Sequence, residues 1–89
     1  MLICKVTGHV WATKKEDSLE GVKFMVVRET GTPRKEPQVM VAADKVGAGI
    51  GEDVLVVSGS TARRALGRAD LPVDCAIVGI IDTVEVEKE

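Results

Sequence analysis

Strand-like segments dominate this sequence and restrict it to a small all-β fold. Residues 2–13, LICKVTGHVWAT, alternate apolar and polar side chains with the period of two that places them on opposite faces of a β-strand. Segments rich in β-branched residues follow at 22–29, 38–44 and 53–59, and a fifth spans 75–86. Because no helices alternate with these strands, we expect a five-stranded antiparallel β-barrel.

The connecting segments carry turn signals and one helix signal. Residues 14–21 are polar and end in glycine, and residues 30–37 contain a glycine and two prolines, so both are predicted to be exposed turns or loops. One short helix is predicted between residues 59 and 72, with Ser60 as its N-cap and Gly67 at the C′ position.

Size and composition predict a single domain, residues 1–89, and exclude several classes of protein. The net charge is −2 with mixed signs, so no basic nucleic-acid-binding surface is expected. The start of the chain lacks a signal-peptide pattern, and no apolar run approaches the ~18 residues of a membrane span. We therefore expect a cytoplasmic protein. Cys4 and Cys75 are predicted to be small apolar thiols, although one disulfide stays possible.

The fifth strand indicates that the subunit assembles. Its Ala76, Val78 and Ile80 share one face, and Ile77 and Ile81 share the other. One apolar face can fill the barrel, and the second face needs a cover because antiparallel sheets usually have one polar face. Two covers are open: a neighbouring subunit, which makes this strand the first candidate interface, or the short helix of the same chain.

The run DKVGAGIGE, residues 44–52, invites a test as a phosphate-binding loop. Its glycines are spaced by two throughout, so the dinucleotide and phosphate-loop patterns both fail. The residues that follow form a strand, whereas anion sites use a helix N-terminus, and Glu52 and Asp53 add negative charge. Three glycines exceed the needs of a tight turn, which suggests that a backbone from another subunit comes close.

The sequence offers few residues that could form a catalytic or metal site. His9 is the only histidine and lies on the polar face of the first strand, and the serines lack a partner for a catalytic triad. We predict no catalytic residues, no metal, no cofactor and no enzyme activity. Asp82 lies among apolar residues, so it is either paired with an arginine such as Arg63 or Arg64, within or between subunits, or placed in water at the barrel rim.

Four pieces in order along the chain resemble the EutN/CcmL family of bacterial microcompartment vertex proteins. They are VTGHVWATKK (6–15), AADKVGAGIGEDVLV (42–56), GSTAR (59–63) and PVDCAIVGIID (72–82). The resemblance implies an OB-like barrel that assembles as a cyclic pentamer. Such pentamers cap the fivefold vertices of a carboxysome- or metabolosome-type shell, in contact with hexameric shell proteins.

The same resemblance implies which residues build the pentamer interface and its axis. They are Asp44, Val46, Gly47, Ala48, Gly49, Gly51, Glu52, Ser60, Ala62, Arg63, Asp74, Ile77, Gly79, Ile81 and Asp82.

Two other functions remain as alternatives. An OB-like module could bind single-stranded nucleic acid, but such sites need stacked aromatics in a basic groove, and the aromatics are only Trp11 and Phe24. An oligomer could also bind a small anion with its glycine loops on the ring axis.

Overall fold

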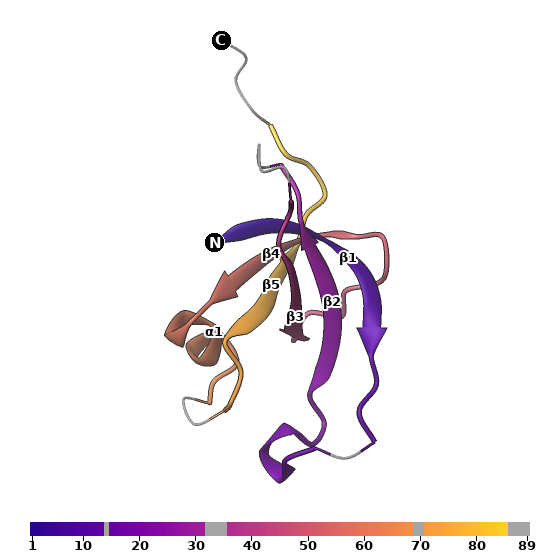
Figure 1. The fold of residues 1–89 in the computed structure, drawn as a ribbon. Coiled ribbons are helices and arrows are strands. Elements are labelled where there is room, and N and C mark those ends of the chain that lie inside the picture. The colour runs from indigo at the N-terminus through magenta and orange to yellow at the C-terminus, as the bar shows by residue number, and fades with distance from the viewer. Residues whose placement is uncertain (14, 32–35, 69–70, 86–89) are drawn as a thin grey trace.

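The computed structural model describes residues 1–13, 15–31, 36–68 and 71–85. These residues form five strands, one short α-helix and one 3₁₀ turn (Figure 1). The elements in chain order are β1 (Leu2–Val10), η1 (Asp17–Leu19), β2 (Lys23–Glu29), β3 (Val39–Asp44), β4 (Asp53–Ser58), α1 (Ser60–Ala65) and β5 (Cys75–Ile80). The predicted helix between the fourth and fifth strands is confirmed. Residues 14 and 32–35 of the two expected turn segments lie outside the described residues.

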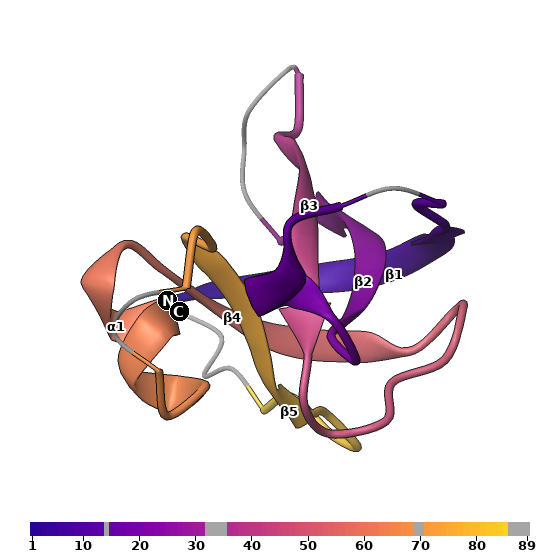
Figure 2. The same cartoon turned by 90° about the horizontal axis from the view of Figure 1, so that it is seen from below.

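The strands close into a barrel in the order β1-β2-β3-β5-β4, and β4 pairs back onto β1 (Figures 1 and 2). Four pairings are antiparallel. The fifth, between β3 and β5, is parallel and consists of Ala43 with Ala76 and Asp44 with Ile77. The five-stranded OB-like barrel is therefore confirmed, but the expectation of a purely antiparallel sheet was wrong. An odd number of strands cannot alternate in direction around a closed ring.

The barrel interior follows the predicted alternation of side chains. On β1, Cys4 and Val6 are buried while Lys5 and Thr7 are exposed. The main interior cluster consists of Cys4, Val6, Met25, Val27, Ala42, Ala48, Val54, Val56, Cys75 and Ile77. These side chains are aliphatic or sulfur-containing and none is aromatic, so small and medium-sized groups fill the interior.

The fifth strand is shorter than the sequence pattern predicts. It ends at Ile80, residues 81–85 form no strand, and Val86 lies outside the described residues. The physical reason is the length of β4, which begins at Asp53: Val54 pairs with Ile80, and a last hydrogen bond joins the Ile81 N–H to the Asp53 carbonyl (2.8 Å). Past that point the strand has no partner on this side.

The helix begins one residue earlier than expected. Ser60 is already helical, and the N-cap is Gly59, which has a positive φ of 68° and no side-chain capping bond. The C-terminal end matches the prediction: Gly67 has φ 76°, and its N–H donates to the carbonyl of Arg64. The N–H of Arg68 reaches the Arg63 carbonyl, completing a Schellman motif. Within the described residues, no helix has the length and hydrophobicity of a membrane span.

Both cysteines are buried, free thiols inside the barrel. Burial, with the nearby charges of Cys75 and Glu29, raises the pKa of the Cys4 thiol from 9.0 to about 11. Burial and the charge of Asp74 also raise the pKa of Cys75. A raised pKa means that the folded state holds its proton more tightly than the unfolded chain does.

We expect this difference to make the fold sensitive to alkali. The contribution of Cys4 is complete below pH 9 and is lost as the pH rises to about 11, a decrease of about 2 kcal/mol in the free energy of unfolding. Urea unfolding in a reducing buffer at pH 8, 9, 10 and 11 measures it. The Cys4→Ala variant should show a shallower decrease, and identical profiles for the two proteins would contradict this assignment.

Candidate functional site: the glycine loop and the surface around it

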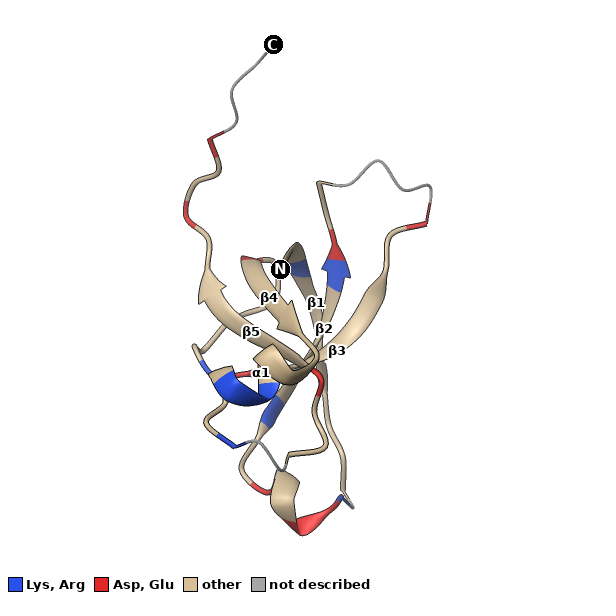
Figure 3. Ribbon diagram, turned by 90° about the vertical axis from the view of Figure 1, so that its left-hand side faces the viewer, with Lys and Arg blue, Asp and Glu red and all other residues tan. Residues whose placement is uncertain are grey.

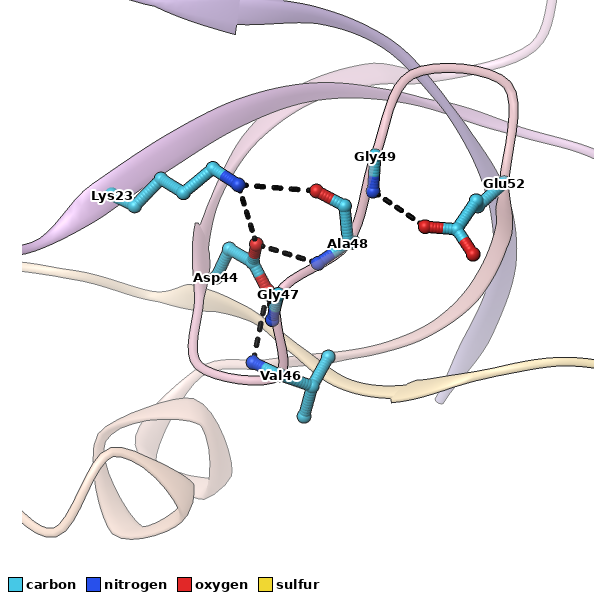
Figure 4. A network of polar contacts seen from close by, with 7 residues as sticks. All are labelled: Lys23, Asp44, Val46, Gly47, Ala48, Gly49 and Glu52. Carbon is cyan, nitrogen blue, oxygen red and sulfur yellow. Dashed lines mark hydrogen bonds and ion pairs between the residues drawn. The ribbon is translucent and has the colours of Figure 1, made fainter.

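The connection between β3 and β4, residues 45–52 (the glycine loop), is organised by Asp44 at the end of β3 (Figure 4). The Asp44 carboxylate accepts hydrogen bonds from three consecutive backbone N–H groups. Oδ1 accepts from Val46 (3.0 Å) and Gly47 (3.1 Å), and Oδ2 accepts from Ala48 (2.8 Å). The side chain of Asp44 is fully buried. A buried carboxylate needs such compensation, and the loop supplies it.

Lys23, at the start of β2, joins the same network. Its Nζ lies 3.4 Å from Asp44 Oδ2 and donates to the Ala48 carbonyl at 3.2 Å (Figure 4). The side chain of Ala48 is buried and belongs to the barrel interior. The loop is therefore part of the subunit's own core as well as part of its surface.

A second carboxylate, that of Glu52, holds the other half of the loop. Its Oε1 accepts from the Gly49 N–H (2.6 Å), and the Gly51 N–H donates to the Val6 carbonyl (2.8 Å). The N–H groups that would cradle a phosphate are thus already bonded within the chain, and the next element is β4 instead of a helix. This geometry agrees with the interpretation that the loop is not a phosphate site, and it removes support for an anion site built from these loops.

The backbone conformation and the contacts of the subunit itself explain why the loop has glycine at three positions. Gly47 and Gly51 adopt positive φ values of 80° and 92°, which favour glycine. At Gly49, a Cβ atom would lie 3.3 Å from Glu52 Oε1 and disturb that hydrogen bond. The glycines therefore do not require a neighbouring backbone, contrary to the expectation from their number.

An apolar notch of about 190 Å³ separates the glycine loop from α1 and β5. It is lined by Lys45, Val46, Ala65, Leu66, Ile77 and Val78. The Nζ of Lys45 donates to the carbonyl of Ala65 (3.1 Å) at the end of α1, which ties the loop to the helix. Loop, helix and strand thus form one continuous surface, with Val46 exposed at the notch.

The outer face of β5 is covered largely by the helix of the same chain. Ala76 packs with Ala62 of α1 and Val57 of β4, and Val78 packs against this cluster. Of the two covers that the sequence left open, the helix therefore covers Ala76 and Val78. Ile80, further along the same face, remains 38% exposed.

Charged residues are unevenly distributed on this surface. Arg63 lies along the subunit and its Nη1 donates to the Val73 carbonyl (3.4 Å), while Arg64 points into solvent. Basic residues are found on α1, and acidic residues follow β5 (Figure 3). Asp82, one of these acids, is exposed in the subunit and forms no ion pair with Arg63 or Arg64 there, so a bridge to a neighbouring subunit and a place in water at the rim both stay open.

The residues of the family signature differ in exposure. Ala48, Ala62 and Ile77 are buried inside the subunit, as is the side chain of Asp44. Gly49, Arg63, Gly79 and Ile81 are partly exposed, and the exposed members are Val46, Gly47, Gly51, Glu52, Ser60, Asp74 and Asp82.

The rings of His9 and Trp11 stack at a centroid distance of 5.6 Å at the end of β1. The Trp11 side chain is 88% exposed, beside an open hollow of about 530 Å³ that Lys15, Lys23 and Phe24 also line. His9 forms no cluster with acidic or thiol groups: no group of three metal-ligating side chains occurs in the described part of the chain.

The chain matches known proteins over nearly its whole length. Residues 1–82 match the family described as ethanolamine utilisation protein EutN/carboxysome. The carboxysome shell vertex protein CcmL of Synechococcus elongatus is 51% identical over 98% of this chain and 89% of its own length. The chain belongs to the EutN/CcmL family.

Two solved structures of the family show how closely the fold agrees. CcmL of Gloeobacter violaceus has a TM-score of 0.87 and 45% identity, covering 98% of this chain and 91% of that one. GrpN, a pentameric microcompartment shell protein from Rhodospirillum rubrum, has a TM-score of 0.83 and 41% identity over 99% and 100% of the two chains.

The sequence reasoning missed one apolar surface of this EutN/CcmL subunit, the outer face of β3. Val39 and Val41 are 61% and 50% exposed, although the alternate residues of β3, including Ala42, already supply the barrel interior. The signal was present in VMVAA, residues 39–43, which has no polar residue on either face. It resembles the pattern of the fifth strand, but no helix of the described residues covers the outer valines.

Replacing the Asp44 carboxylate should destabilise the subunit strongly. Asp44→Asn loses the charge, places an N–H₂ group against backbone donors and removes the ion-pair partner of Lys23, so we expect the free energy of unfolding to fall by about 2 kcal/mol or more. Asp53→Asn is a matched control, because Asp53 Oδ1 also lies close to a lysine (3.5 Å from Lys5 Nζ) but both side chains are exposed. This substitution should change the free energy of unfolding by less than about 0.5 kcal/mol. Denaturant unfolding compares them, and equal effects would refute the role of Asp44.

Proposed function

We propose that this chain is a structural subunit of a bacterial microcompartment shell, in which five copies form a ring at a fivefold vertex. The observation that carries the proposal is the match, over 99% of this chain, to a pentameric microcompartment shell protein with the same fold. A flat hexagonal sheet cannot close without fivefold positions, so the partners are four further copies and hexameric shell proteins. The protein acts in the shell, inside the cytoplasm, without enzyme activity or a cofactor.

The ring contact is proposed to use the surface formed by the glycine loop, α1 and β5. Its exposed and partly exposed residues are Val46, Gly47, Gly49, Gly51, Glu52, Ser60, Arg63, Asp74, Gly79, Ile81 and Asp82. The buried Asp44, Ala48, Ala62 and Ile77 support this surface from inside the subunit. Preorganised surfaces favour association because less conformational entropy is lost on binding.

The mass of the native protein tests the proposal. We expect native mass spectrometry at micromolar concentration to show a species five times the 9.5 kDa subunit mass. A protein that stays monomeric would refute a vertex subunit. The rival function, an OB-like nucleic-acid-binding module, predicts instead a salt-sensitive fluorescence anisotropy change with labelled single-stranded DNA, which a shell subunit should not produce.

A further inference from the structure

A cyclic ring joins two different surfaces of each subunit, and the family signature supplies one of them. In a head-to-tail contact, one patch of each copy meets a different patch of the next copy. The glycine loop, α1 and β5 form a single continuous surface, since Lys45 ties the loop to the helix and the notch is shared by all three. The second surface therefore lies elsewhere on the barrel.

The outer face of β2 and β3 has the properties of that second surface. Val41 pairs with Val26 of β2, and Val39 pairs with Arg28, so their side chains form a compact patch, which we call the β3 face. The same row continues to Ala43, which is covered within the subunit by Leu71 and Val73. No such cover lies over Val39 and Val41 within the described residues, and a sheet face open to water is normally polar.

The edge of β3 is also incompletely paired. Its contact with β5 consists of two residue pairs, those of Ala43 and Asp44, so residues 39–42 have no strand partner on that side in the described part of the chain. An exposed apolar edge strand promotes association unless something blocks or covers it. Arg28 is a single charge at the border of the patch. Val39 and Val41 themselves have no charged group that would prevent association at this edge.

We propose that the β3 face (Val26, Arg28, Val39 and Val41) docks onto a second copy of this chain. The surface that receives it, which we call the notch surface, consists of Val46 and Val78 of the notch together with Ile80 and Asp82, which follow Val78 along the chain. This inference rests on the proposed pentamer and names the surfaces that form it. The valine row of one subunit lies against the apolar notch and Ile80 of the next. Arg28 of the first subunit lies beside Asp82 of the second.

Charge complementarity supports this choice of occupant. Arg28 and Asp82 are both exposed, and neither forms an ion pair among the described residues. Each borders an apolar patch: Arg28 is the register partner of Val39, and Asp82 follows Ile80 by two residues. When the two patches meet, the cation and the anion meet at their border, where opposite charges fix the register of a contact. Two copies of the same patch would instead bring like charges together.

The exposed Trp11 is the main rival as an apolar contact. It lies beyond the last residue of β1, stacks on His9 and borders a hollow with two lysines, Lys15 and Lys23. A partner for that hollow would need acidic groups, and the notch surface beside Lys45 and α1 is basic on that side. Trp11 therefore serves as the control position.

Glutamate substitutions test the β3 face directly. Val39→Glu and Val41→Glu place a carboxylate on a position that is at least half exposed in the subunit, so each variant should remain folded by circular dichroism. We expect both to lose the pentamer in native mass spectrometry, because docking would bury an unpaired charge. Trp11→Glu adds the same charge at an exposed position outside the contact and should remain pentameric.

The outcomes separate this inference from the function on which it rests. A monomeric wild-type protein overturns both. A pentameric wild-type protein with pentameric Val39→Glu and Val41→Glu variants overturns the β3 face alone and leaves the vertex function standing.

Exchanging the charges of Arg28 and Asp82 gives a second test, which does not rely on placing a charge at an apolar position. Arg28→Glu and Asp82→Arg should each weaken the ring at least about tenfold in the midpoint concentration for dissociation, and the double variant should recover most of that loss. Recovery identifies the two residues as partners. Additive losses in the double variant would show that they do not meet.

Discussion

The buried carboxylate of Asp44 is the interaction on which both the barrel and the outer surface of the glycine loop depend. Three backbone N–H groups and the Lys23 ammonium surround it. A segment with three glycines has a high conformational entropy when unfolded, so fixing it requires a strong local interaction. Asp44 provides this interaction, and the loop then places Ala48 inside the barrel and Val46 at the notch. One side chain thus joins the core to the outer surface.

Much of the fold follows from short-range patterns in the sequence. The alternation around Cys4 and Val6 sets which face of β1 is inside, and Gly67 marks the end of the helix. The presence of a parallel pair was also within reach, because five strands in a closed ring require at least one, although the sequence does not show that it joins β3 and β5. The length of β5 was not, because the pattern continues past Ile80 while the partner strand ends.

The candidate site is harder to predict, because its contacts join residues distant in the chain. From the sequence, Asp44 is only a polar residue at the end of a strand, and nothing in the sequence shows that Lys23 of β2 forms an ion pair with it. The glycine pattern indicated a special loop but not its cause, which is the conformation of Gly47 and Gly51 and the carboxylate beside Gly49. A six-residue helix also has too little periodicity to show that Ala62 packs against β5.

The small and medium-sized side chains of the core give a physical reason for the apolar outer surface. The largest fully buried side chain is Met25, and the two aromatic residues lie outside the barrel interior, with Trp11 exposed and Phe24 in a peripheral cluster. A small domain with such an interior buries a limited apolar area, and association commonly provides further stabilisation. Val39 and Val41 add nothing to the interior and would lower the solubility of a monomer. Their presence on β3 is consistent with a subunit whose folded state is completed by its neighbours, so that the stability of the fold rises with the concentration of the chain.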